Sequence, residues 1–270
     1  MWNLGEYRKR PQRLSDYLPW ACLIAPGGVL NKDGSFQRTI RFRGPDLDSS
    51  SPHELVSVRA RLNNVVRRFG ANWCLHMEAQ RRQALAYPKS TFPNPVAQWV
   101  DDVRASAFTS EAGHFESQYF LTFTYLPPSE ELNRLADLFL DQPHKKPQDG
   151  VSYRGYLDFF QGQIEQMVNL LAGFMPEVEP LDDAATLSYL HGCVSDRPIT
   201  IAPPKMPFYL DELLTDRPLI GGLAPRLGPH YLKSVGIRAF PNRTLPCLLD
   251  RLNGLPCEYR WVGRWVPMDK

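Results

Sequence analysis

The sequence lacks a phosphate-binding loop. Its 270 residues contain no Gly-Lys dipeptide, and no G-x-G-x-x-G motif opens a helix after a strand. A P-loop requires a lysine for the phosphates and a hydroxyl for magnesium at fixed spacing after its glycines. The glycines between residues 25 and 44 therefore favour a turn over a phosphate site. Asp33-Gly34, between two runs of β-branched and aromatic residues, predicts a β-hairpin.

Long apolar runs and a strong charge imbalance are also absent. The longest clearly apolar run, Trp20 to Ala25, is far shorter than the roughly 20 residues that a membrane-spanning helix needs. The N-terminus, MWNLGEYRKRPQRLSDY, has no apolar centre like that of a signal peptide, so we expect no export through one. A formal net charge of only +2 argues against a protein built chiefly to coat nucleic acid.

Cysteines are few and scattered. They form no C-x-x-C pair and have no histidine ladder nearby. This usage is typical of small buried side chains in a reducing cytoplasm, and it predicts no structural zinc site. The five cysteines are Cys22, Cys74, Cys193, Cys247 and Cys257.

Three polar motifs imitate catalytic sites without completing them. The His-Phe-Glu motif at residues 114–116 matches half of a zinc-deaminase signature, but no P-C-x-x-C accompanies it. His191 and Cys193 lie two residues apart near an expected helix end, where their side chains do not face each other. The aspartate pair at 182–183 suits a helix N-terminus, with a metal site as the alternative. We therefore assign no catalytic, metal-binding or cofactor-binding residue.

The first half of the chain predicts a sheet with two helices. Ser51 and Glu54 form a capping-box pattern around Pro52, so a helix is expected over residues 52–69. A second helix is expected at 95–110, and strands are expected at 35–43, 72–81 and 115–126. Both helices should cover one face of a mostly antiparallel sheet. Five residues expected in its core are Phe36, Ile40, Leu62, Phe69 and Leu75.

Composition divides the chain into four parts. Residues 1–19 form a basic N-terminal segment, and residues 20–140 form the first α+β subdomain. Residues 141–150, with two prolines and a glycine, are typical of a linker. Residues 151–270, which open with a long amphipathic helix, form a second α+β subdomain. The predicted fold class is thus α+β, with mostly antiparallel sheets, helices packed on one face and two linked subdomains.

Two basic clusters are candidates for membrane or partner contact. The first lies beside aromatic residues at the N-terminus, where it can attract anionic lipid; a solvated, disordered terminus is the alternative. The second consists of arginines on the expected sheet, which in the simpler interpretation only solvate a surface. The candidate contact residues are Arg8, Lys9, Arg10, Arg13, Trp20, Arg41 and Arg43.

Six segments between about residues 13 and 265 carry a family resemblance. They read RLSDYLPWACLIAPGGVLNKDGSFQRTIRFRG, RLNNVVRRFG, HFESQYFLTFTYLPP, LDDAATLSYLHG, PFYLDELLTDRPLIGGLAPRLGPHYLKSV and FPNRTLPCLLDRLNGLPCEYRW. Together they resemble the amino-terminal region of the TrbE/VirB-type conjugative-transfer ATPases of type IV secretion systems.

The resemblance implies a docking and assembly domain that anchors a motor to the inner-membrane platform. The protein would be cytoplasmic and peripheral to the bacterial inner membrane. Its RecA-like motor, with the ATP and magnesium sites, would lie beyond residue 270, and this fragment would not be an enzyme. Implied partners are inner-membrane subunits of the secretion machinery, other copies of the ATPase and an anionic membrane surface, whereas nucleic acid is not expected. The alternative function is a nucleic-acid-binding module that uses an arginine-rich sheet face.

Overall fold

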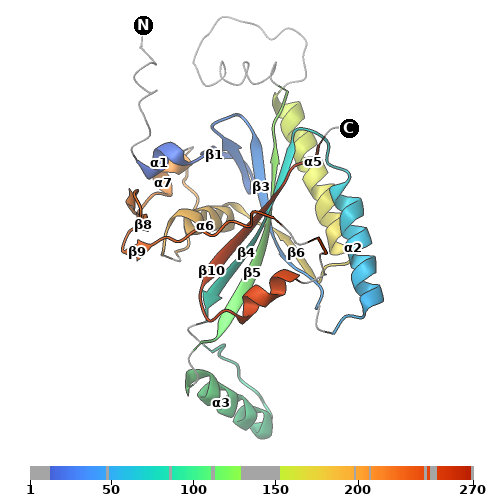
Figure 1. Cartoon of the computed structure of the whole chain (residues 1–270), viewed down its shortest axis with the longest axis vertical. Coiled ribbons are helices and arrows are strands. Elements are labelled where there is room, and N and C mark those ends of the chain that lie inside the picture. Colours follow the sequence, from blue (N-terminus) through green and yellow to red (C-terminus); the bar gives the residue numbers. More distant parts are fainter. Residues whose placement is uncertain are drawn as a thin grey trace, which may run out of the picture.

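A twisted antiparallel sheet forms the centre of the molecule in this computed structural model (Figure 1). The structure describes residues 13–46, 49–84, 87–110, 113–128, 153–197, 199–206, 208–239, 242–243 and 248–268. Within those residues the sheet has seven strands, in the order β1-β2-β3-β5-β4-β10, and β6 pairs with β3. The strands are β1 (Trp20–Ala25), β2 (Gly28–Asn31), β3 (Phe36–Arg43), β4 (Trp73–Gln83), β5 (Phe115–Tyr125), β6 (Glu177–Pro180) and β10 (Tyr259–Trp265).

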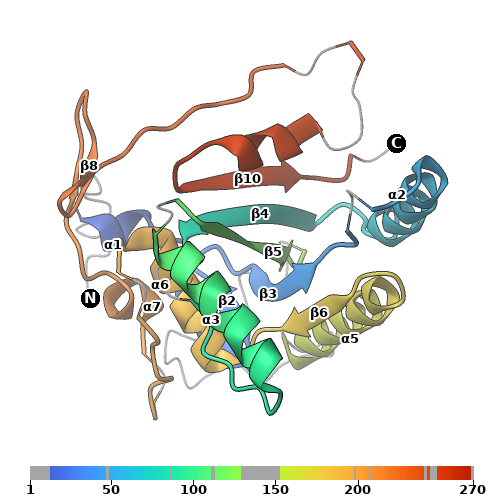
Figure 2. The same cartoon turned by 90° about the horizontal axis from the view of Figure 1, so that it is seen from below.

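Helices lie on both faces of this sheet. In Figure 2, α2 and α5 lie on one side of the strands and α6 lies on the other. The helical elements are α1 (Leu14–Tyr17), α2 (Pro52–Val66), α3 (Pro95–Ser110), α5 (Tyr153–Ala172), α6 (Asp183–Val194), α7 (Leu210–Leu213) and the 3-10 helix η2 (Leu248–Gly254). A small second sheet contains β7 (Leu219–Ile220), β8 (Arg226–Leu227) and β9 (His230–Tyr231).

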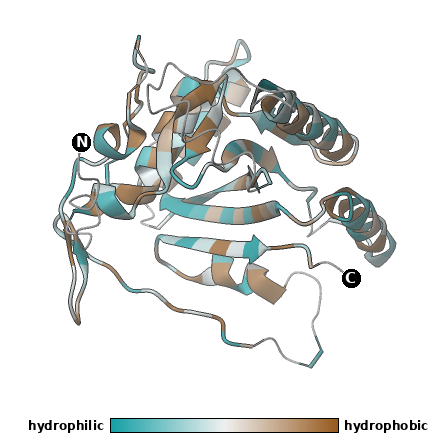
Figure 3. Cartoon of the chain, turned by 90° about the horizontal axis from the view of Figure 1, so that it is seen from above, coloured by the Kyte–Doolittle hydropathy of each residue, from teal (hydrophilic) through white to brown (hydrophobic). Residues whose placement is uncertain are grey.

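The larger hydrophobic core lies between the sheet and the helices α2 and α5. Side chains alternate between the faces of a strand, and the central strands accordingly show alternating hydrophobic and hydrophilic bands (Figure 3). Phe36, Ile40 and Phe123 have no exposed surface, and they pack with apolar residues of α5. The expected sheet core is confirmed, because Phe69 and Leu75 are buried and Leu62 is packed against them.

The second core lies on the opposite face, where α6 and α7 pack against β1 and β2. Trp20, Val29, Leu187 and Leu210 are buried in it. This face also buries polar side chains of the central strands, and some of them pair with one another. For example, the hydroxyl oxygens of Thr39 and Thr122 lie 2.9 Å apart.

Local sequence signals account for α2 and for the β2–β3 hairpin. The Ser51 hydroxyl accepts a hydrogen bond from the Glu54 amide, and the Glu54 carboxylate accepts one from the Ser51 amide, which confirms the capping box. Gly34 has a φ of 84° in the turn, so it supplies the left-handed backbone that the Asp-Gly pair predicts. The hairpin interpretation of this stretch is therefore confirmed.

Other sequence predictions need correction or lie outside the described residues. The helix at 95–110 forms, but none of its residues is buried, so the prediction that it covers the sheet is wrong. Strands β6 and β10, from the second half of the chain, lie in the same sheet as the strands of the first half. The expected linker at 141–150 and residues 1–12 of the N-terminal segment lie outside the described residues. No described helix combines the length and the apolar character that crossing a bilayer requires.

Candidate interaction surface

Helix α3 extends away from the body of the protein. It lies in the connection between β4 and β5, and it projects beyond one end of the sheet (Figure 1). None of its residues is buried. Most helices of globular proteins are stabilised by packing an apolar face against the rest of the fold. The position of α3 is therefore unusual for an amphipathic helix.

The apolar face of α3 is turned toward solvent. Val96, Trp99, Val100 and Val103 lie at helical spacing, and their exposed fractions are 65%, 67%, 39% and 51%. Ala107 continues the same stripe one turn further on and is also exposed. We call these five residues the α3 apolar face. Clustered apolar side chains on an exposed surface are typical of sites that bind another molecule.

Contacts on the opposite face hold α3 in this orientation. The Tyr87 hydroxyl donates a hydrogen bond of 2.7 Å to Asp101. The ring of Phe108 stacks on His114 with 4.2 Å between centroids and meets Tyr87 edge-on at 5.7 Å. The Gln98 side chain accepts a hydrogen bond from the Phe92 amide. Because these contacts use the less apolar side of the helix, the α3 apolar face is left open.

An ionic cluster around the buried carboxylate of Glu78 joins three distant segments on the α6 face of the sheet. Glu78 of β4, whose side chain is 5% exposed, forms a salt bridge with Arg260 of β10. The Arg260 Nε lies 2.5 Å from the carboxylate, and the Tyr189 hydroxyl of α6 donates to the other carboxylate oxygen at 2.7 Å. Arg260 also donates to the Gly192 carbonyl and to the Cys193 Sγ. Burial, helped by Cys193 and Glu78, raises the pKa of the Tyr189 hydroxyl, so Tyr189 stays a neutral donor.

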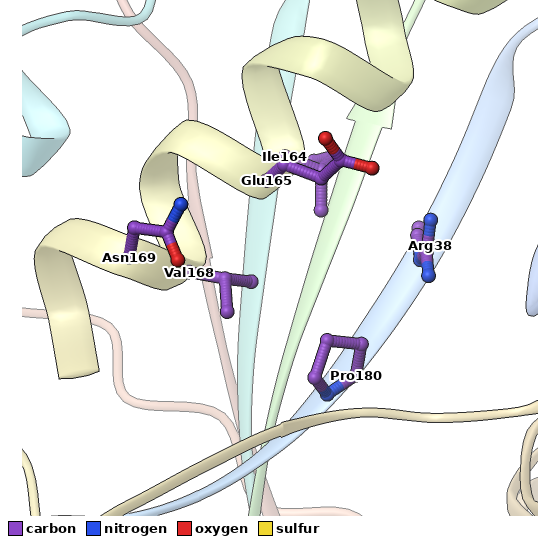
Figure 4. Close-up of a pocket in the computed structure, with 6 residues that line it drawn as sticks. All are labelled: Arg38, Ile164, Glu165, Val168, Asn169 and Pro180. Carbon is purple, nitrogen blue, oxygen red and sulfur yellow. The ribbon is translucent and has the colours of Figure 1, made fainter.

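A small cavity of about 270 Å³ lies between α5 and the strands β3 and β6 (Figure 4). Arg38 and Glu165 line opposite walls, and the Arg38 Nε is buried without a hydrogen-bond partner among the described residues. Burial lowers the pKa of the Arg38 guanidinium, while Glu165 and Asp183 oppose that change. The lining thus contains one guanidinium and one carboxylate. Because these charges cancel, the cavity has no net charge that would favour binding of an anion.

Comparison with known proteins identifies the family. Residues 27–133 match the model for the type IV secretion system ATPase VirB4/TrbE, N-terminal domain. The first of two pieces of a probable conjugal transfer protein TrbE from Sinorhizobium fredii is 35% identical over 127 residues, which cover 46% of this chain and 85% of that piece. The chain belongs to the VirB4/TrbE family. The resemblance drawn from the sequence is therefore confirmed.

Longer VirB4/TrbE relatives align with almost the whole chain. The conjugal transfer protein TrbE of Rhizobium radiobacter is 29% identical over 285 residues, which cover 98% of this chain and 34% of that protein. The type IV secretion system protein virB4 of Brucella melitensis is 22% identical over 266 residues, which cover 91% of this chain and 31% of that protein. This VirB4/TrbE chain thus spans about a third of the length of these curated relatives.

The structure describes four of the predicted contact residues of this VirB4/TrbE chain, namely Arg13, Trp20, Arg41 and Arg43. Trp20 is only 7% exposed and packs in the second core, so its indole is used for packing and is not available to a membrane. Arg41 pairs with Glu179 at 2.5 Å, and Arg43 lies 3.7 Å from Glu177, both across the β3–β6 pair. Arg13 is exposed beside α1, whereas the remaining predicted contacts, Arg8, Lys9 and Arg10, lie outside the described residues.

Sequence reasoning did not identify the α3 apolar face as a surface. The spacing of its valines and Trp99 is the same as that of a helix buried against a sheet. The pattern therefore predicts a helix, but it does not predict which surface the helix packs against. The residues that could have indicated the outward orientation of α3 lie in the loop before this helix. Tyr87 and Phe92, outside any expected strand, supply the contacts that turn α3 outward.

Proposed function

We propose that this chain is a docking and assembly domain of a type IV secretion ATPase of the VirB4/TrbE family. In this proposal it anchors the motor region of the protein to inner-membrane subunits of the secretion machinery. The protein would be cytoplasmic, peripheral to the bacterial inner membrane, and in contact with other copies of the ATPase.

The observation that carries the proposal is the α3 apolar face. A tryptophan and three valines on one helix, all at least 39% exposed, are an unfavourable surface for a protein that works alone. Aromatic side chains such as Trp99 are enriched at the centres of protein interfaces, where they supply much of the binding energy. In a family of secretion-system ATPases, a partner from the same machinery is the simplest explanation.

The alternative, a nucleic-acid-binding module, receives less support. Phosphate contacts need arginines whose charge is free to replace counterions. Arg41 and Arg43, two of the arginines on that expected face, each pair with a glutamate of β6. Arg81, on the same sheet, lies over the ring of Phe115 at 4.7 Å.

The docking proposal predicts a loss of membrane association when a charge enters the α3 apolar face. We expect Val103→Asp in the full-length protein to reduce co-fractionation with membranes that contain the transfer machinery by at least about tenfold, since an interface hot spot contributes about 2 kcal/mol or more and a tenfold change corresponds to about 1.4 kcal/mol. The measurement is the fraction of ATPase recovered with such membranes, compared with membranes from cells without the machinery. Retention of Val103→Asp at the level of the unaltered protein would contradict the proposal.

Val56→Asp is the matched control for this experiment. Val56 lies on α2 and is 54% exposed, close to the 51% of Val103, but it belongs to no comparable stripe. Both substitutions add one negative charge to an exposed valine, so a general effect of charge or stability should appear in both. The proposal requires that only Val103→Asp loses the association.

We also propose that ATP and magnesium are held by a region of the full-length protein other than this chain. The sequence has no lysine or hydroxyl at P-loop spacing after Gly27-Gly28 or Gly221-Gly222. Calorimetry of this chain with magnesium-ATP should therefore show no saturable binding below roughly millimolar, a limit of about 4 kcal/mol of binding free energy. Micromolar affinity, or phosphate release abolished by a substitution in this chain, would contradict that assignment.

A further inference from the structure

We propose that the α3 apolar face binds one amphipathic helix of another protein, packed lengthwise along α3. This inference rests on the proposed docking function, and it adds the kind of partner that the site fits. The occupant would be a helical segment with its own apolar stripe, distinct from a lipid surface and from a second copy of this chain.

The backbone of α3 restricts how a partner can bind. The amide and carbonyl groups within a helix are already bonded to each other, so α3 offers no free edge for an added strand. Recognition must use side chains. The α3 apolar face repeats every three to four residues from Val96 to Ala107, a length of roughly 16 Å at 1.5 Å per residue. A second helix with the same repeat can place its ridges along this stripe, whereas side chains of a strand repeat every two residues.

The charges that flank the stripe favour a protein helix over a lipid surface. By helical spacing, Asp102 lies on one side of the α3 apolar face and Arg104 lies on the other, and both are exposed. Asp101 adds a second carboxylate to the helix. Asp101 itself lies on the face that contacts Tyr87, so the flanks of the stripe carry one carboxylate and one guanidinium and offer anionic lipid headgroups no net attraction. A partner helix can instead place a basic residue near Asp102 and an acidic residue near Arg104.

A second copy of the same helix fits these charges less well. If two α3 helices packed antiparallel about Val100, Arg104 of each would lie opposite the start of the other helix, near Val96, and Asp102 would lie opposite Gln98. In this register, which aligns the centres of the two valine stripes, no pair of opposite charges would form. The stripe also has only five residues, while stable interfaces use about 20 to 30 residues on each side. We therefore assign the face to a different protein chain, as one contact within a larger assembly.

Site-specific photo-cross-linking in cells that carry the transfer machinery tests the proposal. A photoreactive residue is placed at Val96 or at Val103 of the full-length protein, and cross-linked peptides are mapped by mass spectrometry. We expect both positions to label one partner segment at sites about seven residues apart, since seven residues span about 10.5 Å of helix. In an extended partner the same distance covers only about three residues. Ala105, on the opposite and half-buried side of α3, is the control, and its yield should be at least tenfold lower.

The other outcomes overturn the inference. Labels separated by about three residues, labels on α3 of another copy, labels on lipid alone, or no label from either position would each contradict a helical partner. The Val103→Asp experiment keeps this failure separate from failure of the docking function. If that variant loses membrane association but the labels have strand-like spacing, the docking function stands and the helical partner fails. If the variant docks normally and no label forms, both proposals fail.

Discussion

Replacing Arg260 by alanine should lower the free energy of unfolding by about 2 to 3 kcal/mol, below the cost of breaking a fully buried ion pair, because the Arg260 side chain is 31% exposed. Arg260 is the salt-bridge partner of Glu78, whose side chain is 5% exposed. Without the guanidinium, the Glu78 carboxylate would keep the Tyr189 hydroxyl but lose its neutralising charge, while its own side chain is only 5% exposed. Urea denaturation followed by circular dichroism measures the effect.

Two comparisons show whether the effect comes from the buried charge. Arg264→Ala removes an arginine from the same strand and face, but Arg264 forms no salt bridge with any described carboxylate and its Nε lies 3.2 Å from the Cys74 Sγ, so the loss should be below about 1 kcal/mol. A double change, Glu78→Gln with Arg260→Met, should recover much of the stability, because no buried charge is left unpaired. If Arg260→Ala and Arg264→Ala cost the same, the ionic cluster has no special role.

Gly27→Ala should destabilise the fold by about 2 to 5 kcal/mol, the sum of a left-handed backbone cost and an overpacking cost. Gly27 has a φ of 65°, and a Cβ at this position would lie 2.0 Å from the carbonyl oxygen of Leu181. That oxygen belongs to the backbone between β6 and α6, so it cannot move without shifting those elements. The Gly27 amide also donates a 2.7 Å hydrogen bond to Asp183, which ties the β1–β2 turn to the start of α6.

Gly228→Ala separates the two contributions. Gly228 has a similar φ of 56°, but the atoms nearest to a Cβ there belong to the flexible side chain of Arg217. Its substitution should therefore cost only the backbone contribution, about 1 to 2 kcal/mol. Thermal denaturation of both variants measures the difference. Equal losses would mean that the close approach to Leu181 does not limit residue 27.

Elements with local signals were predictable from the sequence. Helix α2 carries its own start signal in Ser51, Pro52 and Glu54, and the structure begins the helix at Pro52. The β2–β3 hairpin is set by Asp33-Gly34 between two strands rich in β-branched and aromatic residues. In both cases the residues that determine the structure lie within a few positions of each other.

Features that depend on distant segments were not predictable in the same way. The ion pairs of Arg41 and Arg43 require β6, which lies more than 130 residues further along the chain. The burial of Trp20 requires α6 and α7, and the arginine pattern alone cannot reveal either neighbour. The direction of α3 depends on Tyr87 and Phe92, whose contacts leave no periodic trace in the sequence.

The pairing of β10 with β4 has a consequence for the order of folding during synthesis. β4 is complete at Gln83, but its neighbour on that side, Tyr259–Trp265, is made about 180 residues later. At ribosomal rates of about 5 to 20 residues per second, β4 waits roughly 10 to 40 seconds with one edge unpaired. An unpaired strand edge is a template for aggregation. The nascent protein therefore passes through a stage in which most of the sheet can form but β4, an interior strand of the complete sheet, still has one open edge. Protection by chaperones should matter most in that interval.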